Sequence, residues 1–366
     1  MTLLQCWHRV PGGTGTSIVS LAGALDQRDD LDVVGVGPWG FTLPPPPWTP
    51  PVPVTRLPLP HAMVYDCWHR LRWPGVERVS GRPDVVHATT TMIPPTRRAA
   101  LVVTVHDIFP LTTPENFTAR GVRLLTRGIE LARRHADIVC SPSQNTIDAC
   151  VDNGFDPARM RLIPWGFDPP PVSPADRARI RNRYSLDGPY LLWVGTVEPR
   201  KNLVTLLRAY KALQPLEEDL VLVGPPGWGS THIEDTRGVA HRVRRLGFVA
   251  PEDLPAIYAE ARAFCFPSLR EGFGLPPLEA MAYGVPVITS KGTACEEVVG
   301  EAGTLVEAND IDGWVDAIRT VCDDEGLRLR MSIEGSARAE AYRWDLAAER
   351  TVAAYRDALD VDTRRN

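Results

Sequence analysis

The chain has 366 residues, of which 44% are hydrophobic and 23% charged, and its formal net charge is −5. This composition is that of a globular protein and excludes fibrous and disordered classes, and the length exceeds what one hydrophobic core usually supports. An acidic total also argues against a dedicated nucleic-acid binder, so no nucleic-acid partner is expected.

The chain contains no run of about 18 uncharged apolar residues, and His8 and Arg9 come too early for a secretory signal. We therefore expect a cytoplasmic protein, with the inner face of the membrane as a further location. The seven cysteines are odd in number and include no C-x-x-C pair, which favours reduced, buried thiols over disulfides or metal ligands.

Short apolar runs alternate with helix-like segments along most of the chain. Runs such as Leu101-Val-Val-Thr-Val105 show no polar alternation, as expected of strands buried on both faces of a parallel sheet. The predicted strands are residues 3–6, 33–36, 85–87, 102–105, 138–141, 162–164, 190–194, 220–223, 263–267 and 285–289.

This β-α-β pattern occurs twice, and a proline-rich connection, Asp168-Pro-Pro-Pro171, separates the two series. It predicts an α/β fold with two doubly wound, Rossmann-like domains that face one cleft. We assign residues 1–166 to the first domain and 167–344 to the second. Ligands of such sheets bind at the carboxyl ends of the strands.

A glycine-rich turn, Arg9-Val-Pro-Gly-Gly-Thr-Gly-Thr16, follows the first predicted strand and precedes a helix predicted over residues 17–25. The turn lacks the third glycine of a dinucleotide fingerprint, and Asp32 begins rather than ends a strand. The glycines still favour a close approach of the backbone to substrate. Gly13 and Gly15 are therefore candidate donor-binding residues.

Residues 44–60 contain nine prolines in seventeen positions and are predicted to form an ordered, extended surface loop. The loop suits either a partner domain that binds polyproline helices or a cover over the acceptor side. Residues 67–134 carry 11 arginines against 5 acidic groups. Such a basic zone suits an anionic acceptor, peripheral association with a membrane, or a solvated helix.

His106 and Asp107 directly follow a predicted buried strand. Their position at the carboxyl end of the strand makes His106 a candidate catalytic residue that orients the sugar or shares a proton. A purely structural histidine is the alternative.

The segment Val194-Gly-Thr-Val-Glu-Pro-Arg-Lys-Asn202 ends the first strand of the second series. Asn202 is a plausible N-cap for a helix over residues 203–213, which would place Arg200 and Lys201 at the helix start. Cations are unfavourable there, so a compensating anion such as a diphosphate is expected. A solvent-exposed basic pair is the alternative.

The strongest motif is Pro267-Ser-Leu-Arg-Glu-Gly-Phe-Gly-Leu-Pro-Pro-Leu-Glu-Ala-Met-Ala-Tyr-Gly284, which runs from a buried strand through a glycine loop into a helix. The donor site is expected to include Phe273, Gly274 and Leu275, with backbone amides near Gly274 and Leu275 facing anionic oxygen. Glu279 is predicted in the first helical turn, where it would accept ribose hydroxyls, and Glu271 would reach toward the sugar. The alternative is that Glu279 is only a favourable first-turn charge and Glu271 only a loop residue.

Together these motifs resemble the retaining GT-B glycosyltransferases of the family-4 type, the glycosyl transferases group 1, over nearly the whole chain. The resemblance also includes Leu220-Val-Leu-Val-Gly-Pro-Pro-Gly-Trp228, Leu246-Gly-Phe-Val-Ala-Pro-Glu-Asp-Leu254 and Ile163-Pro-Trp-Gly-Phe-Asp168. It implies that Glu271 contacts the donor sugar, Glu279 the ribose and Lys201 the diphosphate. It further implies that residues 1–166 form the acceptor-side domain and residues 167–344 the nucleotide-sugar-binding domain. A final helix, about residues 345–366, is expected to pack back on the first domain.

Two positions depart from that family. Thr196 stands where many members have arginine, so Arg200 must supply the second cation, and Trp165 replaces a small polar residue. Neither departure removes a motif carboxylate.

The resemblance predicts transfer of a hexose from a nucleotide-diphosphate sugar to a glycan, glycolipid or small-molecule acceptor. The first candidate is mannose from GDP-mannose. UDP-glucose, UDP-GlcNAc and dTDP-sugars remain open. No cofactor or metal is expected beyond this co-substrate. A nucleotide-sugar epimerase and a non-catalytic binding protein are the rival functions.

Overall fold

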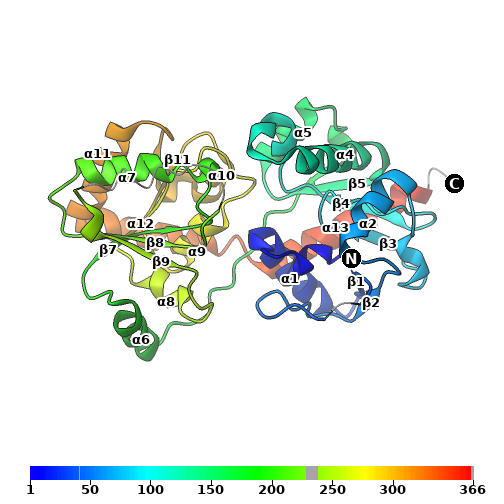
Figure 1. Cartoon of the computed structure of the whole chain (residues 1–366), viewed down its shortest axis with the longest axis horizontal. Helices are drawn as coiled ribbons and strands as arrows, with labels where there is room; N and C mark the ends of the chain where they lie inside the picture. Colours follow the sequence, from blue (N-terminus) through cyan, green and yellow to red (C-terminus); the bar gives the residue numbers. More distant parts are fainter. Residues whose placement is uncertain (41, 228–237, 364–366) are drawn as a thin grey trace. The chain divides into compact units, whose positions relative to one another are not determined.

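The computed structural model describes residues 1–40, 42–227 and 238–363. The chain divides into two compact units, Met1–Gly166 with Trp344–Asn366, and Phe167–Arg343 (Figure 1). Trp228 of the predicted motif and residues 364–366 of the predicted last helix lie outside the described residues. Both units combine helices with parallel strands, which confirms the α/β prediction.

The main sheet of the first unit has four parallel strands, which follow one another in chain order. Side chains of its second strand alternate between two cores, with Leu101 and Val103 in one and Ala100 and Val102 in the other. Both faces are therefore covered, as the unbroken apolar run predicts. The strands are β3 (Val85–Ala88), β4 (Ala100–Thr104), β5 (Ile138–Ser141) and β6 (Met160–Leu162).

The last long helix, α13 (Trp344–Thr363), covers one face of this sheet although it follows the second unit in sequence. Small side chains on one side of the helix, Ala347, Ala354 and Ala358, allow close packing on the core of β4 and β5. The other helices of the unit are η1 (Leu4–Trp7), α1 (Gly12–Asp26), α2 (His61–Asp66), η2 (Cys67–Leu71), η3 (Val76–Arg78), α3 (Phe109–Thr112), η4 (Pro114–Asn116), α4 (Ala119–His135), α5 (Gln144–Asp152) and η5 (Pro157–Arg159).

The predicted strand at residues 3–6 is wrong. Thr2 forms an isolated parallel bridge with Val36, and the Leu3 N–H donates to the Val36 carbonyl at 3.0 Å. The Cys6 N–H then donates to the Leu3 carbonyl, so the chain turns into the short helix η1. Strand pairing therefore ends before the apolar run does.

The proline-rich segment 44–60 is only partly a loop. Residues 54–57 form its longest run without proline, and within it β2 (Val54–Arg56) pairs in parallel with β1 (Gly35–Gly37). Proline has no N–H for a sheet ladder, which explains why the strand is confined to this run. Val52 is buried in the core with Leu3 and Ile18, so the segment packs into the fold as well as over its surface.

The second unit contains one parallel sheet in the order β12-β11-β10-β7-β8-β9. Counted from its first strand this order is 3-2-1-4-5-6, the doubly wound dinucleotide-binding arrangement. Its strands are β7 (Tyr190–Val194), β8 (Asp219–Val223), β9 (Val243–Gly247), β10 (Ala263–Phe266), β11 (Val287–Ser290) and β12 (Thr304–Val306).

Figure 1 shows α7 (Leu203–Ala212) and α11 (Ile311–Asp323) side by side over this sheet, and their residues are in contact. The outermost strands β9 and β12 were not predicted. Polar side chains such as Arg244 and Arg245 interrupt the apolar pattern in β9, because an edge strand is less buried. The remaining helices are α6 (Pro174–Tyr184), η6 (Pro199–Lys201), η8 (Ala240–Arg242), α8 (Leu254–Ala259), α9 (Leu275–Ala282), α10 (Ala294–Val299), η9 (Gly300–Ala302) and α12 (Glu325–Ala339).

No helix within the described residues is both long enough and apolar enough to span a membrane.

A close crossing of two chain segments makes Gly224 a sensitive position. Its φ is +135°, and a Cβ built there would lie 1.9 Å from the carbonyl oxygen of Gly195. We expect Gly224→Ala to destabilise the protein by about 3 kcal/mol or more, because backbone strain adds to the clash. At the control position, Gly188, a Cβ would meet no atom within 4 Å. Urea denaturation followed by tryptophan fluorescence should separate Gly224→Ala from Gly188→Ala, and equal midpoints would contradict this account.

Candidate functional site

The point where the strand order of the second sheet reverses lies between β7 and β10. The chain continues from β7 toward β8 on one side and from β10 toward β11 on the other. The two connections that leave these strands therefore diverge and open a crevice at the carboxyl edge. The first carries Arg200 and Lys201, and the second carries Glu271. The Leu269 N–H donates to the Arg200 carbonyl at 2.9 Å and ties the two connections together.

Four charged side chains meet at this point and form what we call the charge cluster: Glu198, Arg200, Lys201 and Glu271. Lys201 Nζ lies 2.7 Å from Glu271 Oε1, and an Arg200 guanidinium nitrogen lies 2.8 Å from Glu271 Oε2. A second guanidinium nitrogen of Arg200 pairs with Glu198. The structure thus brings together three residues that the sequence predicted separately.

The charge cluster is largely shielded from solvent. Lys201 and Glu271 are each 8% exposed, and Lys201 Nζ lies 4.7 Å from the centre of the Phe266 ring. Burial alone would raise the pKa of Glu271, but the charges of Arg200 and Lys201 outweigh burial and lower it to about 2. Glu271 is therefore a carboxylate at neutral pH, and the cluster holds two positive and two negative groups.

The sequence led us to expect that Arg200 and Lys201 need an anion from a ligand, and this pairing corrects that expectation. Glu198 and Glu271 supply the negative charge within the protein. Asn202 occupies the N-cap position of α7, but its side chain makes no cap hydrogen bond. Its amide instead donates to the Ala308 carbonyl at 2.7 Å.

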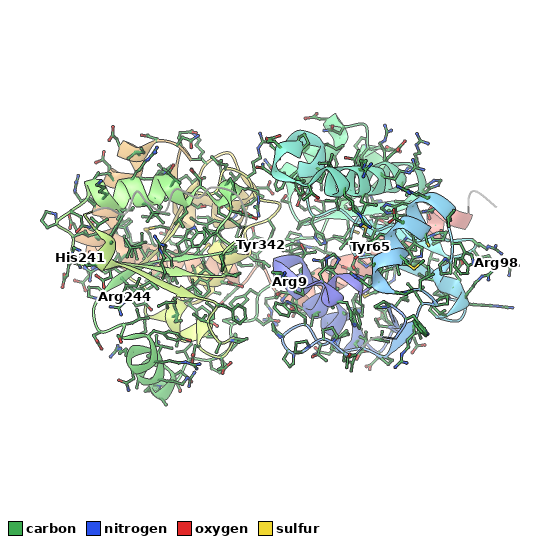
Figure 2. All side chains as sticks on the ribbon, viewed as in Figure 1. Arg9, Tyr65, Arg98, His241, Arg244 and Tyr342 are labelled. Atoms are coloured by element: carbon green, nitrogen blue, oxygen red, sulfur yellow. The ribbon has the colours of Figure 1, made fainter. Side chains whose placement is uncertain are left out.

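The start of α9 has few amides available for a ligand. Gly274 is the N-cap residue, with a φ of +124°, and a Cβ there would lie 3.0 Å from Cys295 Sγ. The helix then begins with Leu275, Pro276 and Pro277, and the two prolines have no N–H. The backbone donors at this point are therefore those of Gly274 and Leu275, as predicted. Phe273 is buried and contacts Tyr342, which Figure 2 labels, with ring centres 5.9 Å apart.

Glu279 does not lie in the first turn of α9, so its predicted stabilisation by the helix dipole is wrong. It lies one turn later, where the Tyr258 hydroxyl donates to Glu279 Oε2 at 2.7 Å. Burial raises the pKa of Glu279 to about 7, and the hydrogen bond from Tyr258 opposes that rise. The residue as a whole is partly exposed, whereas its carboxyl group is the buried part that titrates late.

Gly13 and Gly15 lie inside a helix rather than in a turn. Helix α1 begins at Gly12, five residues earlier than predicted. A Cβ at Gly15 would lie 2.4 Å from Pro11 Cβ and 3.2 Å from Trp48 Cδ1, so local packing explains this glycine. Gly13 is exposed at the helix start.

His106 follows β4 in the first unit, as predicted. Its Nε2 forms a 2.8 Å hydrogen bond with the Thr89 carbonyl, and its ring packs edge-on against Trp165 at 5.2 Å. Burial lowers the pKa of His106 to about 4, although the bond to Thr89 opposes this shift. The carbonyl can only accept, so Nε2 carries the proton and the buried Nδ1 has no hydrogen-bond partner.

Sequence reasoning missed two residues of the site, Glu198 and Tyr258. Glu198 lies within the quoted segment between Val194 and Asn202, and only its contact with Arg200 reveals its role. Tyr258 comes from α8 and carried no sequence signal. Among the described residues, no group of three or more His, Cys, Asp and Glu side chains is placed to hold a metal ion.

Ligands of a doubly wound sheet bind in the crevice at its switch point, and cations placed there suit the oxygens of a phosphate. The family model described as Glycosyl transferases group 1 matches residues 188–324, and that described as Glycosyltransferase Family 4 matches residues 11–170.

Two relatives and one solved structure extend these matches. The chain is 34% identical over 284 residues to the O-antigen chain mannosyltransferase B of Escherichia coli, covering 75% of this chain and 74% of that protein. It is 33% identical to the D-inositol 3-phosphate glycosyltransferase of Corynebacterium glutamicum, covering 62% of this chain and 58% of the relative's length. The crystal structure of Anabaena HepE with UDP-glucose superposes with a TM-score of 0.73 at 22% identity, covering 94% of this chain and 96% of HepE.

The chain therefore belongs to the group 1 glycosyltransferases, with the GT-B fold.

The raised pKa of Glu279 predicts a change of stability with pH. The group titrates near 4.5 in the unfolded chain and near 7 in the folded one. Between these values the unfolded state loses its proton first, so the folded state loses stability as pH rises through this window. Glu279→Gln should be more stable than the wild type above pH 7, by on the order of 1 to 3 kcal/mol, and this advantage should vanish below pH 4.5.

Urea denaturation at several pH values measures this difference, and Glu340→Gln at an exposed position is the control. Parallel pH profiles for the wild type and Glu279→Gln would mean that the carboxyl group is not perturbed.

Proposed function

We propose that this enzyme transfers a hexosyl group to a glycan, glycolipid or small-molecule acceptor with retention of anomeric configuration. The first candidate donor is GDP-mannose, from which mannose would be transferred. The observation that carries the proposal is the charge cluster at the switch point of the second sheet. There, two cations lie beside a motif carboxylate, three residues before the N-cap Gly274 of α9.

The choice of mannose is supported by the name of the Escherichia coli relative. UDP-glucose, which the HepE crystal contains, is the next donor to test. A thermal-shift screen of nucleotide diphosphates and their sugars addresses this choice directly. A ligand at 100 times its dissociation constant adds about 2.7 kcal/mol to stability, which is readily measured.

The diphosphate has to compete with carboxylates that already pair with the cations. In the unliganded protein Arg200 and Lys201 both contact Glu271. We propose that the guanidinium fork and the ammonium group transfer part of this pairing to the phosphate oxygens, with the amides of Gly274 and Leu275 nearby. Glu279 accepts the ribose hydroxyls, and Glu271 lies toward the sugar.

In the proposed reaction the bond between the anomeric carbon and the diphosphate oxygen breaks, and the sugar develops oxocarbenium character. Negative charge grows on the departing oxygen, and Arg200 and Lys201 stabilise it more in the transition state than in the ground state. The acceptor hydroxyl then bonds to the same face of the anomeric carbon. Its proton passes to the departing phosphate oxygen. His106, a neutral imidazole, is proposed to orient the sugar.

The charge cluster gives opposite expectations for its cations and its carboxylate. Arg200→Ala and Lys201→Ala should each lower kcat/KM by the equivalent of about 3 kcal/mol of transition-state stabilisation, because stabilisation of the leaving diphosphate is lost. Glu271→Gln should lower turnover but bind the nucleotide diphosphate as tightly as the wild type or more so. The reason is that it removes a negative charge 2.7 Å from Lys201 Nζ.

Steady-state kinetics and calorimetry measure these effects, with the exposed Lys211→Ala as the matched control. Near-wild-type rates for both Arg200→Ala and Lys201→Ala would contradict the proposal that these residues bind the diphosphate. An inverted anomer in the product, read by NMR, would remove the same-face mechanism.

We also propose that transfer needs no divalent cation, because Arg200 and Lys201 can neutralise the diphosphate. Activity should remain nearly unchanged in excess chelator. A loss that magnesium or manganese restores would show that the cations of the protein are insufficient.

A surface of the first unit suits peripheral binding to an anionic membrane. We call it the arginine surface, and it consists of Arg70, Leu71, Trp73, Arg120 and Arg123. Leu71 is 71% exposed and Trp73 is 43% exposed, and all three arginines are exposed. Asp66 joins its two segments, because it pairs with Arg70 at 3.6 Å and with Arg120 at 3.2 Å.

Two residues of the predicted basic zone, residues 67–134, are structural instead. Trp68 is fully buried, and the Arg72 guanidinium donates to the carbonyls of Trp68, Ile93 and Pro94. The remaining exposed arginines attract anionic headgroups, and Leu71 and Trp73 can enter the interface.

If the acceptor is a lipid, the protein should bind vesicles rich in anionic lipid at low salt and should dissociate as salt rises. Flotation measures this binding. Leu71→Ser combined with Trp73→Ser should weaken it, whereas Leu329→Ser, which changes an exposed leucine of the second unit, should not. Absence of binding at low salt would favour a soluble acceptor.

A further inference from the structure

Three aromatic side chains connect the carboxyl group of Glu279 to the segment that joins the two units. We call Tyr258, Tyr283 and Phe167 the aromatic relay. All three lie in the second unit: Tyr258 in α8, Tyr283 directly after α9, and Phe167 at the start of the unit. The reaction proposed above uses none of them.

Tyr258 of α8 spans one turn of α9. Glu279 and Tyr283 are four residues apart, and the Tyr283 N–H donates to the Glu279 carbonyl at 3.2 Å, so both side chains lie on one face of α9. The Tyr258 hydroxyl donates to Glu279 Oε2 at 2.7 Å, and the Tyr258 ring stacks on the Tyr283 ring with their centres 6.1 Å apart. Tyr258 is 1% exposed and also packs against Phe264, which leaves its hydroxyl little freedom to move.

Tyr283 also contacts the segment that joins the two units. Its ring lies edge-on to the Phe167 ring at 5.8 Å, and its hydroxyl donates to the Pro170 carbonyl at 3.3 Å. Phe167 is the first residue of the second unit, and its N–H donates to the Tyr342 carbonyl at 2.9 Å. The chain passes from one unit to the other at residues 166–167 and 343–344, so this bond joins the two crossing segments on the side of the second unit.

The hydrogen bond from Tyr258 determines how the carboxyl group of Glu279 can act. It orients one carboxyl oxygen, and it opposes the rise of the Glu279 pKa that burial causes. Without this donor the carboxyl group would rotate more freely and would keep its proton to higher pH. In both respects it would be a poorer acceptor for a hydroxyl group. Whatever fixes the ring of Tyr258 therefore also acts on Glu279.

We propose that the aromatic relay positions Glu279 for the hydroxyls of the nucleotide ribose, so that the segment joining the two units contributes to nucleotide binding. Tyr258, Tyr283 and Phe167 are positioning residues, because they act on the ligand through Glu279. The ribose rests on the proposed function, whereas the coupling of Glu279 to Phe167 through the two tyrosines does not.

Nucleotides with and without ribose hydroxyls test this proposal. Calorimetry measures the binding of GDP, UDP and their 2′,3′-dideoxy forms to the whole protein. Tyr258→Phe keeps the ring and removes the hydroxyl, and Tyr283→Leu keeps an apolar side chain that cannot stack. Each should weaken binding of the ribonucleotide about tenfold, roughly the effect of one lost hydrogen bond, and should leave binding of the dideoxynucleotide within about twofold of the wild type.

Three further variants separate the relay from general damage to the fold. Tyr283→Phe retains the ring contacts with Tyr258 and Phe167 and should bind both forms almost as the wild type does. Phe167→Leu removes the ring that contacts Tyr283 and should weaken binding of the ribonucleotide alone. Tyr210→Phe is the matched control, because it removes a buried hydroxyl that donates to the Glu218 carbonyl at 2.8 Å. It should change neither affinity.

A titration without nucleotide tests the relay independently of the proposed function. NMR of isotope-labelled glutamate carboxyl groups follows the protonation of Glu279, and Glu279→Gln assigns its signal. The hydrogen bond from Tyr258 lowers the pKa of Glu279. Tyr258→Phe and Tyr283→Leu should therefore both raise the titration midpoint, whereas Tyr283→Phe should leave it unchanged.

Two results would overturn the inference. One is an unchanged midpoint in Tyr258→Phe and Tyr283→Leu, and the other is a loss of affinity that is equal for the ribonucleotide and the dideoxynucleotide. If the midpoints shift but the wild type binds neither nucleotide, or binds both forms equally, the result contradicts the ribose assignment of the proposed function. It then still supports the coupling of Glu279 to Tyr283.

Discussion

The contact of one carboxylate, Glu271, with two cations depends on β7 and β10 being neighbours in the second sheet. Arg200 and Lys201 are about 70 residues away from Glu271 in the chain, and only the switch of strand order brings their loops to one crevice. The bond from Leu269 N–H to the Arg200 carbonyl then holds the loops in register. A different strand order would separate the charges and leave buried groups unpaired, which is costly.

The balanced charge of this cluster suits the proposed binding and release of a diphosphate. Two unpaired buried cations would be unfavourable in the free protein and would hold a diphosphate product tightly. Glu198 and Glu271 neutralise them in the absence of ligand. Glu279 behaves in the opposite way, because no cation within the described part of the chain pairs with it and burial raises its pKa. The pKa values of two carboxyl groups eight residues apart are therefore shifted in opposite directions for a physical reason.

Several partly buried histidines of the first unit are held by neutral hydrogen bonds. His106 bonds the Thr89 carbonyl, and His8 and His61 share the Tyr65 hydroxyl. Burial keeps these imidazoles neutral.

The sequence by itself determined the α/β class, most strands and the residues at the ends of β7 and β10. These features are local, because an apolar run of five residues and a glycine loop before a helix have the same meaning wherever the chain folds. Tertiary structure alone decided that residues 3–6 turn into a helix, that β2 forms within the proline-rich segment, and that Gly15 packs against Trp48. It also decided which charges meet. Contacts between distant segments decide whether Arg200 faces a ligand or Glu198. They also decide whether a helix dipole or the Tyr258 hydroxyl acts on Glu279. No local pattern encodes those distances.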